Sequence, residues 1–222
     1  MTDWQKHFAT SSTFGGSTEQ WAYDVAKRAA PDMPEKQRQY VLSVARGEGY
    51  FGLGWGNPSA RTIADSQHFG ITGYEGQGSN NWGAVQGSGD AGSFPHVDYH
   101  ADGSRYLGYY KRYSTPEAGF LDIARTILGG GKRKAIGAKA IKSAINAGSL
   151  KKAVYAQHAN GYFELAPAKY LAAVVKNYKT MTAKTGWPPK LSVGGSTVFE
   201  LIAGVLVGVG GLYGYKKLRK RA

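Results

Sequence analysis

The sequence has no cysteine, and it has only 15 acidic residues against 28 lysines and arginines in 222 residues. Without cysteine, the chain has neither a disulfide framework nor a metal site built on thiolates. The five histidines, His7, His68, His96, His100 and His158, show no His-Glu-x-x-His pattern and no other familiar zinc spacing. We therefore expect neither a metal nor a cofactor.

The shortage of acids leaves a net charge of +13. Such a balance favours an anionic partner, such as a nucleic acid, an acidic membrane surface or a polyanionic cell wall. One run without any acid comprises Lys132, Arg133, Lys134, Lys139, Lys142, Lys151 and Lys152. A solvated helical face explains such a run, and so does attraction to wall polymers or anionic lipid. No recognised nucleic-acid motif accompanies it, so we expect no specific nucleic-acid partner.

An apolar run is also missing at the start of the chain, where residues 1–18 are polar and rich in Ser, Thr and Gly. These residues lack the basic start and apolar core of a secretory signal. We therefore interpret residues 1–16 as an N-terminal arm.

Capping residues and helical spacing divide most of the remaining chain into helices. They predict helices at residues 17–30, 35–47, 115–128, 132–148, 150–158 and 167–182. A Gly-, Ser- and Asn-rich loop is expected at 47–92, and a β-hairpin at 96–110 with a turn at 101–103. The predicted fold class is mainly α (α+β), with one helical domain over residues 17–183.

The composition changes again near the end of the chain. Residues 184–197 are rich in Pro, Gly and Ser and predict a linker. Residues 198–215 are apolar or small, with Glu200 as their only charge, and residues 216–222 form a basic tail. At about 1.5 Å per residue, the apolar segment spans roughly 27 Å, close to the ~30 Å hydrocarbon core. We therefore predict a transmembrane helix, with membrane lipid as a partner and the basic tail on the cytoplasmic side.

One carboxylate lies where glycoside hydrolysis would need it. Glu48 follows the apolar end of a predicted helix and precedes Gly49, Tyr50 and Phe51. Cleaving a glycosidic bond requires an acid that keeps its proton, and a Glu at the edge of an apolar cleft has that property. A solvent-exposed carboxylate at a helix end is the structural alternative.

Five further segments follow Glu48 in a characteristic order, at 79–87, 97–103, 110–120, 144–148 and 161–163. They contain Asn-Asn-Trp-Gly, a hairpin Asp-Tyr with an Asp-Gly turn, Lys-Arg-Tyr-Ser-Thr before a helix, Asn-Ala-Gly and a late Gly-Tyr. Over about residues 40–178 the sequence resembles the glucosaminidase family of glycoside hydrolases, which includes bacterial autolysins and flagellar-rod muralytic domains. The resemblance implies a lysozyme-like fold that cleaves the β-1,4 bond between N-acetylglucosamine and N-acetylmuramic acid.

The same resemblance implies roles for individual residues. Glu48 matches the catalytic acid of the family, and Asp98 matches the hairpin carboxylate that acts as base or charge stabiliser. The sequence departs from the family here, because Asp98 is shorter than the usual Glu and His96 replaces a Thr. Asp90 and Asp102 are therefore alternatives for the second carboxylate, although Asp102 is also explained as a turn residue.

Further candidates would contact the sugar. Tyr162 matches the late tyrosine that lines the cleft near the acid, with a core tyrosine as the alternative. Asn81, Trp82, Gln86 and Tyr99 are candidate substrate-binding residues, since amides suit hydroxyl and N-acetyl groups and aromatic faces suit pyranose rings. Gln86 also resembles the Met-Gln of lytic transglycosylases, which share the fold and need a single Glu.

The sequence thus predicts a membrane-anchored peptidoglycan hydrolase of the endo-β-N-acetylglucosaminidase type. A phage virion would deliver such an enzyme without a signal peptide, for wall penetration or lysis. A lytic transglycosylase or a muramidase on the same fold is the first alternative. A non-catalytic wall-binding protein and a membrane-tethered DNA-handling protein are the others.

Overall fold

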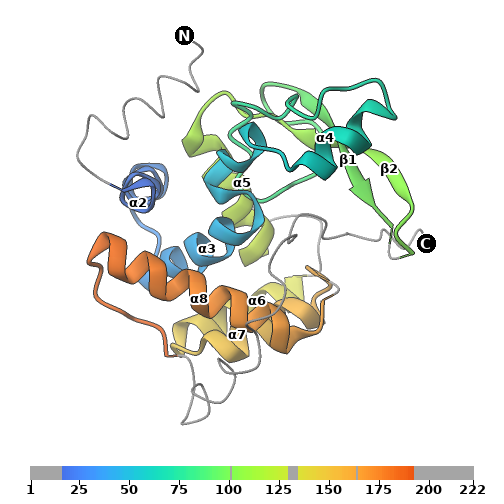
Figure 1. Ribbon diagram of the computed structural model, residues 1–222. Coiled ribbons are helices and arrows are strands. Elements are labelled where there is room, and N and C mark those ends of the chain that lie inside the picture. Colours follow the sequence, from blue (N-terminus) through green and yellow to red (C-terminus); the bar gives the residue numbers. More distant parts are fainter. Residues whose placement is uncertain (1–16, 101, 130–134, 164, 193–222) are drawn as a thin grey trace.

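The computed structural model describes residues 17–100, 102–129, 135–163 and 165–192 (Figure 1). These residues form seven α-helices, labelled α2 to α8, two short 3₁₀ helices and one two-stranded antiparallel sheet. The helices are α2 (Thr18–Ala29), α3 (Glu35–Glu48), α4 (Ala60–Gln67), α5 (Pro116–Leu128), α6 (Ala135–Asn146), α7 (Leu150–Ala159) and α8 (Pro167–Thr185). The strands are β1 (Ser93–Tyr99) and β2 (Arg105–Lys111). The prediction of a mainly helical α+β fold with one small hairpin is confirmed.

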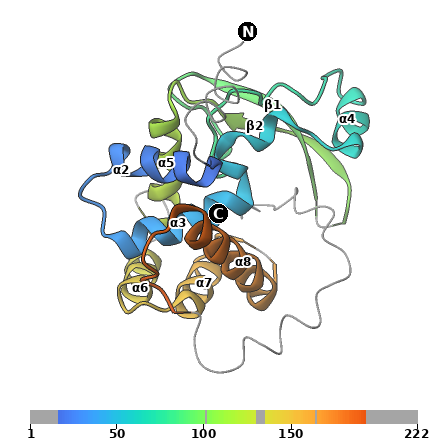
Figure 2. The ribbon, with the colours of Figure 1, turned by 60° about the vertical axis from the view of Figure 1, so that its left-hand side comes forward.

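Helix α3 lies at the centre of the arrangement. Helices α6, α7 and α8 lie on one side of it, and the hairpin with α4 lies at the opposite end, as both ribbon views show (Figures 1 and 2). Helix α3 packs against α8, α6, α5 and α2. Its residues Tyr40, Val41, Leu42 and Val44 are fully buried, so α3 carries much of the core. The last residue of this central helix is Glu48.

Local capping determines where several helices begin. The Ser17 hydroxyl accepts a hydrogen bond from the backbone N–H of Gln20, and the Thr115 hydroxyl accepts one from Ala118. Pro116 occupies the first turn of α5, where a missing N–H costs nothing. Helix α5 ends at Gly129, whose φ of 86° lies in the left-handed region that glycine adopts without strain. The predicted starts at Ser17 and Thr115 are therefore confirmed.

The predicted loop at 47–92 contains more structure than expected. It includes the 3₁₀ helices η1 (Tyr50–Gly52) and η2 (Gly54–Gly56), as well as α4, which the sequence analysis did not predict. Ser59 caps α4 by accepting a hydrogen bond from the N–H of Thr62. Helix α4 contacts β1 and so supports the outer side of the hairpin.

The predicted linker begins too early at residue 184. Trp187 and Leu191 are 3% and 6% exposed and belong to the main core. Ser192 pairs with the preceding helices, because its N–H donates to the carbonyl of Gly148 and its carbonyl accepts from the N–H of Leu150. The folded domain therefore extends to at least Ser192.

No helix in the described part of the chain is long and apolar enough to cross a membrane. The predicted transmembrane segment 198–215 lies outside the described residues, as do the predicted arm 1–16 and the basic tail 216–222. The structure therefore does not show the predicted single-pass membrane anchor, and that localisation is corrected. Membrane lipid as a partner stays a prediction.

Candidate active site

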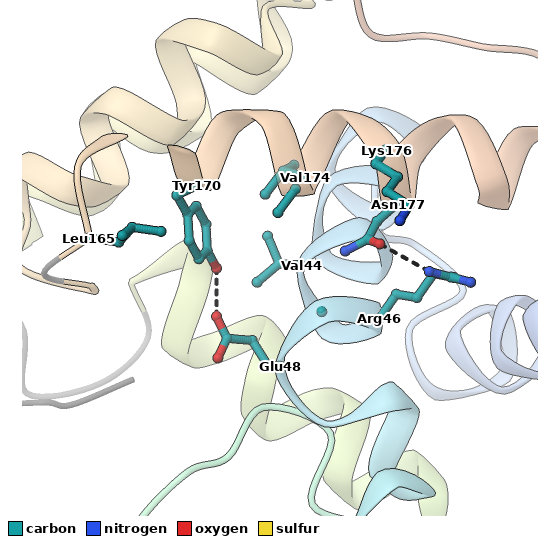
Figure 3. A pocket seen from close by; sticks show the side chains of 10 residues that line it. Val44, Arg46, Glu48, Leu165, Tyr170, Val174, Lys176 and Asn177 are labelled. Atoms are coloured by element: carbon teal, nitrogen blue, oxygen red, sulfur yellow. Dashed lines mark hydrogen bonds between the residues drawn. The ribbon is translucent and has the colours of Figure 1, made fainter. Parts of the chain in front are cut away.

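The carboxyl group of Glu48 meets a tyrosine from the other end of the chain. The Tyr170 hydroxyl, on α8, donates a hydrogen bond of 2.6 Å to Oε1 of Glu48 (Figure 3). Because α3 ends at Glu48, the carboxyl group also lies at the negative end of the helix dipole, which disfavours a further negative charge. The phenol donor therefore favours the ionised form of Glu48, whereas the helix end favours its neutral form.

Tyr170 is held firmly in place. Its ring stacks on Phe163, with centroids 3.8 Å apart and an interplanar angle of 15°. Burial, followed by the negative charge of Glu48 and the hydrogen bond to it, raises the pKa of the Tyr170 phenol well above its ordinary value of 10.0. The phenol therefore keeps its proton at every physiological pH and acts as a hydrogen-bond donor. Tyr162 is half-buried, and its ring centroid lies 6.5 Å from that of Phe163, so its role near the acid stays a prediction.

A cavity of about 250 Å³ opens beside Glu48 and Tyr170, between α3 and α8. Its walls are largely apolar and include Val44, Leu165 and Val174 (Figure 3). Apolar walls weaken the hydration of a neighbouring carboxylate. Glu48 thus lies at the edge of an apolar cavity, the environment that the sequence analysis expected for a general acid.

The backbone next to Glu48 adopts an uncommon conformation. Tyr50 and Phe51 have φ angles of 47° and 60°, and Asn80 and Ala84, in the 79–87 loop, have 51° and 48°. Non-glycine residues rarely occupy this left-handed region, and such residues concentrate at functional sites. The two loops contact each other closely, since a Cβ atom added to Gly49 would lie 2.9 Å from the carbonyl oxygen of Asn81.

The structure gives Asn81 and Trp82 roles other than sugar binding. Both are fully buried, which corrects the prediction that they contact substrate. The Asn81 side chain donates to the carbonyls of Val85 and Lys111 and accepts from the N–H of Val85, each at 2.9 Å. Trp82 packs in the core against Phe51, among other rings. These residues hold the 79–87 loop against β2 and the end of α3.

Asp98 belongs to a separate cluster inside the hairpin. It is 3% exposed, and its Oδ2 accepts hydrogen bonds from the hydroxyls of Tyr106 and Tyr110 at 2.6 and 2.7 Å. Burial and the bond to Asp98 raise the pKa of Tyr106 to about 12, so this phenol remains a donor. Gln86 also reaches Oδ2, at 3.4 Å, so two predicted site residues do meet. The role of Asp98 as the second carboxylate stays a prediction, since its hydrogen-bond partners are hairpin groups and the Gln86 side chain.

The remaining predicted residues are tied into the structure locally. The hydroxyl of Tyr99 donates to Asp65 of α4, and the guanidinium of Arg61 lies 4.7 Å above its ring. Asp102 accepts from the N–H of Ser104 in the hairpin turn, as the turn alternative predicted. Asp90 accepts from the N–H and hydroxyl of Ser114. These contacts fix loops and leave Glu48 as the carboxylate beside the cavity.

His96 is a titratable side chain on β1. It packs edge-on against Trp55 and Tyr110, with ring centroids 5.0 and 5.8 Å apart. Burial lowers the pKa of His96 below its ordinary value of 6.5, although Asp98 and Glu75 act in the opposite direction. The unfolded chain therefore takes up a proton before the folded chain does, and stability decreases as the pH falls below about 6.5.

We expect His96→Phe to reduce the loss of stability at low pH. Thermal unfolding between pH 7 and pH 5 should show a smaller decrease in Tm for the variant than for the wild type, because phenylalanine keeps the ring contacts and has no proton to gain. His100→Phe, at an exposed position, is the control. Parallel curves for the wild type and His96→Phe would contradict the assignment.

Tyr170 was not among the predicted site residues. A tyrosine within an apolar helical pattern is typical of a core residue, and Tyr170 is indeed buried. One local signal was present. Helix α8 starts at Pro167, and Tyr170, Val174 and Asn177 lie on one face of it. Only the fold shows that this face meets Glu48.

The described residues also present a strongly cationic surface on α6, α7 and α8. Nine lysines between residues 135 and 192 are exposed, and the only acidic residue in this range is Glu164. They are Lys139, Lys142, Lys151, Lys152, Lys169, Lys176, Lys179, Lys184 and Lys190. None of the ion pairs found in the described ranges involves them. Lys132, Arg133 and Lys134 of the predicted run lie outside these ranges.

In the part of the chain that the structure describes, no three His, Asp or Glu side chains converge as metal ligands.

No family model matches the chain, and no curated protein matches it in sequence. Among solved structures, the chain is similar to the catalytic domain of the autolysin Auto from Listeria monocytogenes, with 16% sequence identity and a TM-score of 0.44. The match covers 84% of this chain and 86% of that chain. Similarity at this level leaves the family of this chain a prediction.

Proposed function

We propose that the protein is a glycoside hydrolase that cleaves the glycan strands of peptidoglycan, with Glu48 as its general acid. The observation that carries this proposal is the 2.6 Å hydrogen bond from Tyr170 to Glu48 at the edge of an apolar cavity. The cationic surface on α6, α7 and α8 supports an anionic polymer as the substrate. The motif order over residues 40–178 supports peptidoglycan in particular.

The geometry suits both halves of a proton transfer. The negative end of α3 and the apolar cavity wall favour the neutral carboxylic acid, which can donate its proton to the glycosidic oxygen as the bond breaks. After the transfer, Glu48 carries a negative charge, and the Tyr170 phenol stabilises it by the hydrogen bond already in place. No reorganisation is needed at that moment, because stacking on Phe163 fixes the phenol.

The bond between N-acetylglucosamine and N-acetylmuramic acid is the proposed point of cleavage, as in an endo-β-N-acetylglucosaminidase. An inverting enzyme would need a second carboxylate about 6.5–9.5 Å from Glu48, and a retaining enzyme one at about 5–5.5 Å. Asp98 is buried, and its carboxylate accepts hydrogen bonds from hairpin groups and from Gln86. That burial favours a second candidate function, lytic transglycosylation, in which a single Glu is sufficient.

Mass spectrometry of the products distinguishes these activities. Purified peptidoglycan is digested with the full chain, and the new ends are identified. Reducing N-acetylglucosamine ends support the glucosaminidase. Reducing N-acetylmuramic acid ends indicate a muramidase, and 1,6-anhydro-muramic ends indicate the transglycosylase. The absence of any product would overturn the catalytic proposal and favour a wall-binding protein.

Removing the Tyr170 hydroxyl should change the pH profile as well as the rate. Tyr170→Phe keeps the stack on Phe163 but removes the donor that favours ionised Glu48. A hydrogen bond to a charged group contributes ~1.5–3 kcal/mol, so we expect kcat to fall by about 10- to 100-fold. A general acid must be protonated to act. Without the donor, Glu48 holds its proton to higher pH. The alkaline limb of the kcat profile should therefore shift to higher pH.

Tyr178→Phe is the matched control. It removes a phenol from the same helix, but this phenol bonds Gln39 and Leu191 rather than Glu48. Its pH profile should match that of the wild type. A Tyr170→Phe enzyme with an unshifted alkaline limb would show that the phenol does not act on the catalytic proton.

A further inference from the structure

The cavity beside Glu48 has two chemically different ends. Glu48 and Tyr170 lie at one end, and Lys176 and Asn177 lie at the other, with Val174 between them (Figure 3). Tyr170 and Lys176 are six residues apart on α8, which corresponds to about 9 Å along the helix axis at 1.5 Å per residue. A group bound at the Lys176 end would therefore lie beyond the first sugar ring next to the reacting bond, where a substituent of that ring can reach.

The positive charges at this end differ in how they are compensated. Arg46 is committed, since its Nε donates to Glu19 at 3.1 Å and its Nη1 donates to Asn177 at 3.0 Å. Asn177 is also fixed, because its Nδ2 donates to the carbonyl of Ser43. Lys176, by contrast, lines the cavity, is exposed, and belongs to none of the ion pairs in the part of the chain that the structure describes.

We propose that the Lys176 end of the cavity is a subsite for a carboxylate attached to the muramic acid residue of the substrate. This inference rests on the proposed function and concerns the recognition of substrate rather than the chemistry. N-acetylmuramic acid differs from N-acetylglucosamine by a lactyl ether, which ends in a free carboxylate in bare strands and carries an acidic peptide in intact wall. Lys176, at the exposed rim of the cavity, meets that carboxylate.

The size of the cavity agrees with one substituted ring. Its volume of about 250 Å³ is slightly below the ~300–1,000 Å³ of pockets for drug-sized ligands. The long stem of lysine suits a position at the rim, because the ammonium can follow a carboxylate while staying partly hydrated. Lys176 then distinguishes the two alternating sugars and so determines which bond is presented to Glu48.

A matched control separates binding by Lys176 in the subsite from general electrostatic attraction between the cationic helix and an anionic glycan. Lys179 is exposed on the same helix three residues later, yet it does not line the cavity. Lys176→Met and Lys179→Met therefore remove the same charge from α8 and keep the aliphatic stem. Only Lys176→Met removes it from the proposed subsite, and Lys176→Arg restores the charge there.

The test measures binding in full-length protein that carries Glu48→Gln, so that no cleavage occurs. Three ligands are compared: soluble wall fragments with their peptides, amidase-stripped strands with free lactyl carboxylates, and stripped strands whose carboxylates have been converted to methylamides. We expect Lys176→Met to weaken binding about fivefold for at least one carboxylate-bearing ligand, as for a partly exposed ion pair. Lys176→Arg should recover it, and the methylamide strands should show no difference.

The ligand that responds identifies the source of the carboxylate, either the lactyl group or the peptide. Equal losses for Lys176→Met and Lys179→Met, an equal loss on the methylamide strands, or no loss on any ligand would overturn the subsite. Failure of the proposed function looks different, because Glu48→Gln protein would then still cleave peptidoglycan, or wild-type protein would release no products from it.

Discussion

Replacing Glu48 by glutamine is expected to lower kcat/KM on peptidoglycan by about 10²–10⁴-fold, the usual contribution of a general acid. That loss corresponds to roughly 3–5 kcal/mol of transition-state stabilisation. Glutamine has nearly the same shape and still accepts the hydrogen bond from Tyr170, but it cannot donate the proton that the departing oxygen needs. Turbidity decrease of a wall suspension, together with quantified reducing ends, measures the effect.

The fold of the Glu48→Gln protein should remain intact, because Glu48 is only half-buried at the end of α3. Its melting temperature therefore separates lost chemistry from lost structure. Glu117→Gln provides the control, since Glu117 pairs with Arg28 on the surface of α5 and lies away from the cavity. A Glu48→Gln enzyme within a few-fold of wild-type activity would remove Glu48 from the mechanism.

The parts of the fold that were predicted correctly depend on local signals. Ser17 and Thr115 cap helices through hydrogen bonds to residues three positions later, so each cap is visible within one short segment. The hairpin was visible because its Asp-Gly turn and alternating side chains are also local. Helix α4 was missed because Ala60–Gln67 is short and polar, with Ile63 as its one large apolar side chain.

The remaining errors concern contacts between distant segments. Trp187 precedes two prolines and resembled a linker, but its indole donates to Thr182 and packs on Tyr23 across the domain. Glu48 is predicted as the acid because its own neighbours in the sequence are informative. Its partner Tyr170 lies 122 residues away, and nothing near Tyr170 in the sequence indicates the contact. Asn81 shows the opposite error, since an amide that would suit a sugar instead bonds the backbone of β2.

Trp82→Ala distinguishes the packing role of this residue from the sugar-binding role that the sequence predicted. Trp82 is fully buried, and its ring centroid lies 5.5 Å from that of Phe51, 5.6 Å from that of Phe120 and 5.7 Å from that of Trp21. Truncating a buried tryptophan to alanine typically costs about 3–5 kcal/mol, because the lost contacts are accompanied by a cavity. We expect a decrease of that size in the free energy of unfolding, measured by urea denaturation.

Trp82→Phe should lose much less of the free energy of unfolding than Trp82→Ala. The indole Nε1 of Trp82 has no hydrogen-bond partner among the described residues, so phenylalanine gives up ring area but no polar contact. Residual activity of Trp82→Phe should show a KM close to that of the wild type, since the side chain does not reach the cavity. A raised KM with unchanged stability in either variant would instead restore Trp82 as a sugar-binding residue. The two outcomes differ because a buried ring stabilises the loop that lies against Gly49, whereas a cleft ring would stabilise only the complex with substrate.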